Sequence, residues 1–194
     1  MLNIEIIRLE AKERMNKKLS IRDLCQIGIF TAVIIICAQI SVPMPYGVPM
    51  TMQTFAIPLA GIVLGAKKGT ISSLVYILLG MAGIPVFSGF SCGIGTVFGM
   101  TGGFIISFPI MALFAGIGEG RRKMSWLISG LIAGTAVNFF CGMVYFSLVM
   151  SNSLHTSFTA CVLPFIPAGV IKIILAAVSG RTIKRVLVRG GMLD

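Results

Sequence analysis

Residues 102–150 read GGFIISFPIMALFAGIGEGRRKMSWLISGLIAGTAVNFFCGMVYFSLVM. Two apolar runs, 102–118 and 126–150, flank the basic triplet Arg121, Arg122 and Lys123. A helix needs about 20 mostly apolar residues to cross the hydrocarbon core of a bilayer. Each run approaches or exceeds that length, so the stretch predicts two membrane-spanning helices joined by a short basic loop.

The composition of the whole chain agrees with this interpretation. Of its 194 residues, 56% are hydrophobic and only 11% are charged, and the mean hydropathy is +0.98. Soluble globular domains are about one quarter charged. A bilayer, unlike water, does not require a polar exterior. We therefore predict an all-α integral membrane protein of one domain, located in the cell membrane as a multi-pass protein.

Further apolar runs bring the predicted number of transmembrane helices to about six. They lie at residues 24–40, 55–66, 70–86 and 161–178. The run at 55–66 reaches back toward Val48 and is short enough to be re-entrant instead of spanning.

The positions of the basic residues predict the topology. Fifteen of the sixteen Lys and Arg residues fall in four groups, at 8–22, 67–68, 121–123 and 181–189. Six spans with both termini in the cytoplasm place all four groups on one side, as the positive-inside rule requires. A nucleic-acid surface would spread basic residues over one solvated face, so the net charge of +10 does not indicate nucleic-acid binding.

This topology divides the chain into three predicted parts: a cytoplasmic N-terminal segment at 1–22, a six-helix membrane domain at 23–180, and a basic cytoplasmic tail at 181–194. The N-terminal segment has apolar residues at helical spacing among charges. Two interpretations remain open for it, an amphipathic helix on an anionic membrane surface or a frayed tail. No cleavable signal peptide is predicted in this segment, and Met15 is an alternative start.

Lys172 is the exception to the basic groups, because it lies inside the sixth apolar run. It precedes Arg181 by nine residues, which puts it roughly 13 Å from the helix end. An ionisable side chain at that depth usually faces a cavity or a partner. No Asp or Glu lies in any predicted span, so its partner is either a bound anion or backbone and hydroxyl acceptors. The alternative is that its long stem carries the charge to the membrane interface.

The connections predicted to face outside are uncharged and rich in Gly, Pro and aromatic residues. Phe87 and Phe90 lie in one of them. Such loops suit a lid over a small, partly apolar ligand, or they are ordinary loops that anchor at the lipid headgroups. Asn138 is a further candidate polar contact because of its depth in the fifth run. Pairs of small residues, such as Gly28/Ala32 and Gly61/Gly65, allow close helix packing within the chain or with a partner.

The sequence lacks the residues that several functional classes require. The sequence has no GxxxxGK[ST] phosphate loop, so it does not predict ATP hydrolysis by a P-loop. Its single histidine, His155, offers no metal cluster or catalytic triad, and its five cysteines have no metal-ligand spacing and are predicted to be buried free thiols. We predict no enzyme activity, no metal and no cofactor. Active transport through this chain would need energy from another subunit.

Ordered motifs resemble those of the BioY family, the biotin-specific S components of ECF-type (energy-coupling factor) vitamin transporters. Residues 48–69, VPMTMQTFAIPLAGIVLGAKKG, resemble the family signature, which continues in the outside connections. The further motifs are YILLG at 76–80, GIPVFSGF at 83–90, GIG at 93–95, TGGFIISFP at 101–109, and PFIP at 164–167 followed by Lys172. The resemblance covers residues 23–177.

The resemblance implies a six-helix subunit that captures biotin from outside and topples in the membrane. A separate transmembrane subunit and two ATPase subunits would supply the energy. Gly28 and Ala32 match the family's docking face for the transmembrane subunit, and Lys172 matches its binding-site lysine. Lys172 would attract the ligand carboxylate, and the apolar parts would pack on phenylalanines. Together with Asn138, which is chosen for its membrane depth, the predicted substrate-binding residues are Lys172, Gln53, Ser91, Phe87, Phe90 and Phe104.

Three positions depart from the family pattern. Gly169 replaces a common Asp, Met100 replaces the Pro of a G-P-T-G-G-Y motif whose last residue is Phe104 here, and Ser91 stands where some members have Arg. The lost Asp removes an acceptor for ureido N–H groups and a partner for Lys172. Two alternatives to biotin therefore stay open: another small anionic vitamin-like solute, or a scaffold subunit that binds no ligand.

Overall fold

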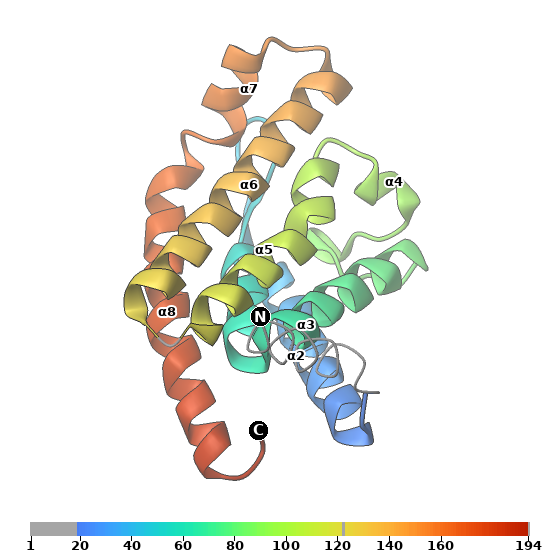
Figure 1. The fold of residues 1–194 in the computed structure, drawn as a ribbon. Helices are drawn as coiled ribbons and strands as arrows, with labels where there is room; N and C mark the ends of the chain where they lie inside the picture. Colours follow the sequence, from blue (N-terminus) through green and yellow to red (C-terminus); the bar gives the residue numbers. More distant parts are fainter. Residues whose placement is uncertain (1–18, 122, 194) are drawn as a thin grey trace, which may run out of the picture.

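Five long helices make up most of the computed structural model, which describes residues 19–121 and 123–193 (Figure 1). They are α2 (Ile21–Gln39), α3 (Gln53–Met81), α5 (Gly102–Gly120), α6 (Met124–Met150) and α8 (Phe165–Arg189). Each is long and apolar enough to cross a membrane. The short elements between them are β1 (Ser41–Val42), β2 (Met50–Thr51), η1 (Ser88–Phe90), α4 (Ile94–Val97) and α7 (Leu154–Cys161).

Helix α3 consists of two segments separated by a sharp bend at Gly65, where φ is 83° and ψ is 170°. This positive φ favours glycine, which lacks a Cβ. The segments 53–64 and 66–81 correspond to the second and third predicted runs, and counting them separately gives the six expected helical segments. The first is about 18 Å long at about 1.5 Å per residue, which is shorter than the ~30 Å hydrocarbon layer.

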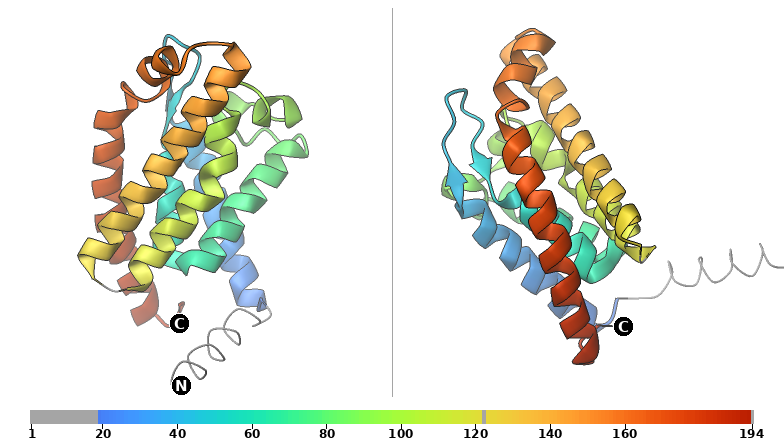
Figure 2. Two further views of the ribbon diagram at one scale, coloured as in Figure 1. Left: turned by 45° about the horizontal axis from the view of Figure 1, so that its top comes forward. Right: turned by 90° about the vertical axis from the view of Figure 1, so that its left-hand side faces the viewer.

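The two ends of the bundle are formed by different segments (Figure 2). One end carries the start of α2, the α3 bend, the α5–α6 loop and the end of α8, and the described basic groups lie in these segments. The other end carries the β1–β2 hairpin, α4 and α7. By the positive-inside rule the basic end faces the cytoplasm, in agreement with the predicted orientation. The N-terminal segment predicted as an amphipathic helix or a tail falls mostly outside the described residues.

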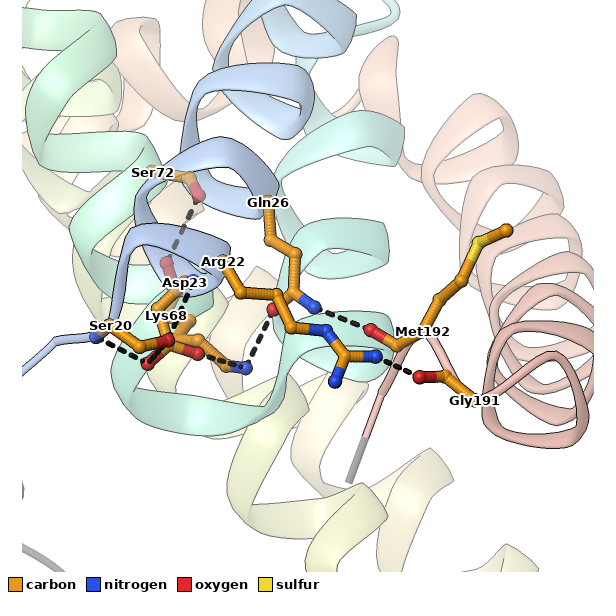
Figure 3. A network of polar contacts seen from close by, with 8 residues as sticks. All are labelled: Ser20, Arg22, Asp23, Gln26, Lys68, Ser72, Gly191 and Met192. Carbon is orange, nitrogen blue, oxygen red and sulfur yellow. Dashed lines mark hydrogen bonds and ion pairs between the residues drawn. The ribbon is translucent and has the colours of Figure 1, made fainter.

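Polar contacts fasten the helices together at the basic end (Figure 3). Lys68, just after the α3 bend, lies 2.9 Å from Asp23 Oδ1 and 2.7 Å from Gln26 Oε1 of α2. Gln26 Nε2 donates to the Met192 main-chain oxygen at 2.6 Å, and Arg22 donates to that of Gly191. The chain after α8 therefore returns to α2.

Glycines mediate the close contacts between helices inside the chain. A Cβ on Gly61 would lie 2.2 Å from the Ala112 oxygen, and one on Gly130 would lie 2.5 Å from the Phe114 oxygen. These residues bring α3 and α6 against α5, which lies in the middle of the fold. Gly28 differs, because nothing lies within 4 Å of its Cβ position, and both it and Ala32 are exposed.

The connections are more structured than the sequence predicted. Residues 154–161 form α7, capped by Ser153, so the last long helix begins at Phe165 and not at Cys161. That helix also runs on to Arg189, through most of the region predicted as a tail. All five cysteines are free, but only Cys161 is fully buried, so the prediction that all are buried is wrong.

Candidate functional site

A cavity of about 400 Å³ opens in the half of the bundle that is away from the basic end. Its walls come from the β1–β2 hairpin, the start of α3, the loop around η1, the α4–α5 connection, and the facing sides of α5, α6 and α8. Its volume lies within the range of sites for small molecules. No carboxylate among the described residues lines it.

Lys172 lies on the α8 wall of this cavity and is only 8% exposed. Its Nζ donates to the main-chain oxygen of Thr51 at 2.7 Å and to Thr54 Oγ1 at 3.1 Å. The side chain thus stays inside the protein and does not extend to the membrane interface. Both partners are neutral, while the described carboxylates Asp23 and Glu119 pair with basic residues elsewhere.

The position of Thr51 depends on a chain of buried hydrogen bonds. Gln53 Oε1 accepts from Thr51 Oγ1 at 2.8 Å, and Gln53 Nε2 donates to the hydroxyl of the fully buried Tyr76. Both ends of the Gln53 amide are therefore occupied by the protein. Although Gln53 lines the cavity, its main structural effect is to hold the carbonyl that receives Lys172.

Phe87 forms another wall and is 1% exposed. Its ring stands edge-on to Tyr76, with 5.4 Å between the ring centroids, and packs on Gly80. Gln39, at the end of α2, holds this loop in place. Its Nε2 donates to the Phe87 oxygen at 3.1 Å, and its Oε1 accepts from the Phe90 N–H at 3.0 Å. The sequence analysis did not find Gln39.

Ser91 and Phe104 also line the cavity, whereas Asn138 and Phe90 are not among its lining residues. Phe90 is 70% exposed and has a φ of 56°. Asn138 is fully buried behind the wall, and its Nδ2 donates to the Phe104 oxygen at 2.9 Å and to Ser107 Oγ at 2.8 Å. Asn138 thus supports the α5 backbone at Phe104. The cavity brings together Lys172, Gln53, Ser91, Phe87 and Phe104.

Several lining residues were missed by the sequence analysis, although helical spacing offered a signal for one of them. Phe165 precedes Lys172 by seven residues, which places it on the same face of α8 as Lys172 and Gly169. The missed side chains on other elements include Thr51, Thr54, Phe108, Thr135 and Phe139. A Cβ on Gly169 would lie 3.5 Å from the Phe139 ring, which is an ordinary contact distance. The cavity therefore has space for a small side chain there.

Comparison with known proteins decides the family. The sequence profile of the BioY family matches residues 14–189. The chain belongs to the BioY family. The resemblance predicted from the motifs is thereby confirmed, and so is the multi-pass architecture in the cell membrane.

The match to individual BioY relatives extends over nearly the whole length of each relative. The chain is 39% identical over 157 residues to a probable biotin transporter BioY of Pyrococcus horikoshii, covering 81% of this chain and 93% of the relative. It is 32% identical over 165 residues to the biotin transporter BioY of Thermotoga maritima, covering 84% and 96%. A solved structure of the S-component for biotin from an ECF-type ABC transporter superimposes with a TM-score of 0.78 and 28% identity, covering 85% of this chain and 92% of that one.

Proposed function

We propose that this BioY protein is the membrane-embedded substrate-binding subunit for biotin uptake. The observation that carries the proposal is Lys172, a buried cation on the wall of a ligand-sized cavity, whose hydrogen-bond acceptors among the described residues are neutral. Biotin transport is the activity named for its relatives, and the S-component for biotin has the same fold. The chain is then a transport subunit and not an enzyme.

The carboxylate of biotin supplies the negative charge that the cavity lacks. Lysine has three N–H donors, and Thr51 and Thr54 accept from two directions. The remaining donor is free to bond a ligand oxygen. A buried charge is stable when it is paired and hydrogen-bonded, so an anionic ligand is favoured over a neutral one.

The rest of the ligand meets apolar walls. Phe87, Phe104, Phe108, Phe139 and Phe165 all line the cavity. Such a lining suits the aliphatic chain and the sulfur-containing ring of biotin. The hairpin and the loop around η1 border the cavity on the outer side, so the ligand enters from outside the cell.

Uptake needs partner subunits, because this chain carries no phosphate-binding loop. We propose one transmembrane partner and two ATPase subunits. The exposed face of α2 at Gly28 and Ala32 supports docking of the transmembrane partner, since small residues let helices approach closely. Gly61, Gly116 and Gly130 differ, because each is already used in a close contact inside the chain.

A second candidate ligand class is another small carboxylate of vitamin size. Gly169 and Ser91 favour it, because Gly169 stands where BioY proteins commonly have Asp, and Ser91 stands where some of them have Arg. A ligand of this class would still bind Lys172 through its carboxylate. It would differ from biotin only in the group that occupies the rest of the cavity. A ligand-free scaffold is disfavoured by the buried lysine.

Competition in cells separates these candidates. The full chain is expressed with ECF partner subunits in a biotin-auxotrophic bacterium, and uptake of radiolabelled biotin is measured against excess lipoate, pantothenate or unlabelled biotin. We expect only unlabelled biotin to compete. Loss of labelled uptake with another carboxylate would favour the second candidate, and no uptake beyond cells lacking the chain would contradict the proposal.

A further inference from the structure

Thr135 of α6 has an unusual environment for a helical threonine. It lines the cavity, it is only 7% exposed, and its Oγ1 has no hydrogen-bond partner among the described residues. Helical hydroxyls commonly bond the carbonyl four residues earlier, as Thr31 and Ser107 do here. Leaving a buried hydroxyl without a partner is unfavourable.

The packing of α6 against α8 places Thr135 at the level of Lys172. Toward the outer end, the Phe139 ring contacts the Cβ position of Gly169. Toward the basic end, Leu131 belongs to one apolar cluster with Ala176. Thr135 lies one helical turn from both Leu131 and Phe139, and Lys172 lies about one turn from both Gly169 and Ala176. The two antiparallel helices therefore present Thr135 and Lys172 at the same depth.

The chemistry at this depth suits a carboxylate. A carboxylate has two oxygens with several acceptor sites, and one lysine N–H does not fill them. A threonine hydroxyl can donate one hydrogen bond, and bonds to charged groups are stronger than those between neutral groups. Of the two buried hydroxyls that line the cavity, Thr51 is already bonded to Gln53, and Thr135 is free to donate.

We infer that Thr135 is a second anion-binding residue, whose hydroxyl donates to the carboxylate that Lys172 attracts. This inference rests on the proposed function and specifies how it selects its ligand. An acid binds through both groups. An amide or ester of the same shape loses the charge and with it most of the benefit of both contacts.

The test measures ligand binding to the full chain in lipid nanodiscs by calorimetry. Biotin is compared with biotin amide, which has the same shape and no charge. Thr135→Val removes the hydroxyl and nearly keeps the shape, and Thr135→Ser restores the hydroxyl. Thr182→Val is the matched control, because Thr182 is also a helical threonine, lies outside the cavity and donates to the Val178 oxygen at 2.9 Å.

We expect Thr135→Val to weaken biotin binding about 10- to 100-fold, the range for a hydrogen bond to a charged group. Its affinity for the amide should change less than about threefold, and Thr135→Ser and Thr182→Val should bind biotin within about threefold of wild type. The melting temperature of the ligand-free Thr135→Val variant should equal or exceed that of wild type, because an unbonded buried hydroxyl is removed.

Other results overturn one or both proposals. Unchanged biotin binding by Thr135→Val, or equal losses for acid and amide, contradicts the role of Thr135 and leaves the proposed function standing. If wild type binds lipoate or pantothenate and not biotin, the biotin assignment fails, and the same variants are compared on that acid and its amide. If wild type binds none of these acids, both proposals are wrong.

Discussion

Lys172 Nζ lies 2.7 Å from the main-chain oxygen of Thr51, a residue 121 positions earlier in the chain. This contact joins α8 to the end of the β1–β2 hairpin across the cavity. The cation that we propose to bind the ligand therefore also fixes a segment at the outer rim. A ligand that engages Lys172 acts directly on the group that holds the hairpin.

The first prediction concerns Gln53, which holds Thr51 in place. Gln53→Leu leaves the Tyr76 hydroxyl without its buried partner and the Thr51 hydroxyl without its acceptor. Losing such partners costs about 1–3 kcal/mol each, so thermal unfolding in detergent should shift to lower temperature and biotin binding should weaken. The double variant Gln53→Leu/Tyr76→Phe should recover part of the stability. Equal melting temperatures for wild type and Gln53→Leu would refute this role.

The second prediction concerns Gln39, which ties the cavity loop to α2. Gln39→Leu removes its bonds to the Phe87 oxygen and the Phe90 N–H. Hydrogen exchange at residues 86–91 should become faster, and biotin should dissociate faster, because the wall at Phe87 is less ordered. Ile36→Leu, at an exposed position of the same helix, is the control. Unchanged exchange in this loop would show that Gln39 does not hold it.

The third prediction concerns the glycine that precedes Lys172 by one turn. Gly169→Asp places a carboxylate on the same face as the lysine, where the Cβ meets only the Phe139 ring at 3.5 Å. Residues three apart on a helix can pair, so the charge available to a ligand is reduced. The preference for biotin over biotin amide, measured by calorimetry, should fall about 10-fold. Gly169→Asn has the same size without the charge and should keep the preference; an equal preference in all three proteins would contradict the account.

The fourth prediction separates binding from uptake. Gly28→Leu adds a side chain where nothing lies within 4 Å in the isolated chain, so folding and biotin binding should be unchanged. Copurification with the transmembrane partner and uptake of labelled biotin should both fall, because helices can no longer approach closely there. Gly80→Leu is the opposite case, since even a Cβ would lie 2.1 Å from the Phe87 ring, and it should impair folding. Normal uptake by Gly28→Leu would exclude this face from docking.

The membrane spans could be predicted from sequence because hydropathy and charge act locally. The bend at Gly65 could not be located from the sequence. Nothing in the sequence distinguishes a glycine with a positive φ from a glycine that allows close helix packing. Helix α7 was missed because residues 151–160 are not apolar enough to be read as a span, although Ser153 gives a capping signal. The two interpretations of the segment before residue 19, an amphipathic helix or a tail, remain predictions.

Lys172 could be identified because a lone charge at membrane depth needs a partner. Its acceptors Thr51 and Thr54 could not be identified, because their contact with Lys172 depends on how the hairpin and the start of α3 pack against α8. Asn138 was chosen for its depth, but its side chain turns toward the α5 backbone. Phe90 was chosen as an aromatic of the lid, but Gln39 holds its main chain while the side chain is exposed. Side-chain direction is set by tertiary packing, which motifs do not encode.

The most direct test of the central claim is calorimetric binding of biotin to the full chain in nanodiscs, for wild type and Lys172→Met. Methionine keeps much of the apolar stem and removes the charge, and Lys184→Met at the basic end is the control. We predict that wild type binds biotin, that Lys172→Met weakens it about 100-fold or more, and that Lys184→Met has no effect. A folded wild-type chain that does not bind biotin, or a Lys172→Met variant that binds it as tightly, would contradict the account.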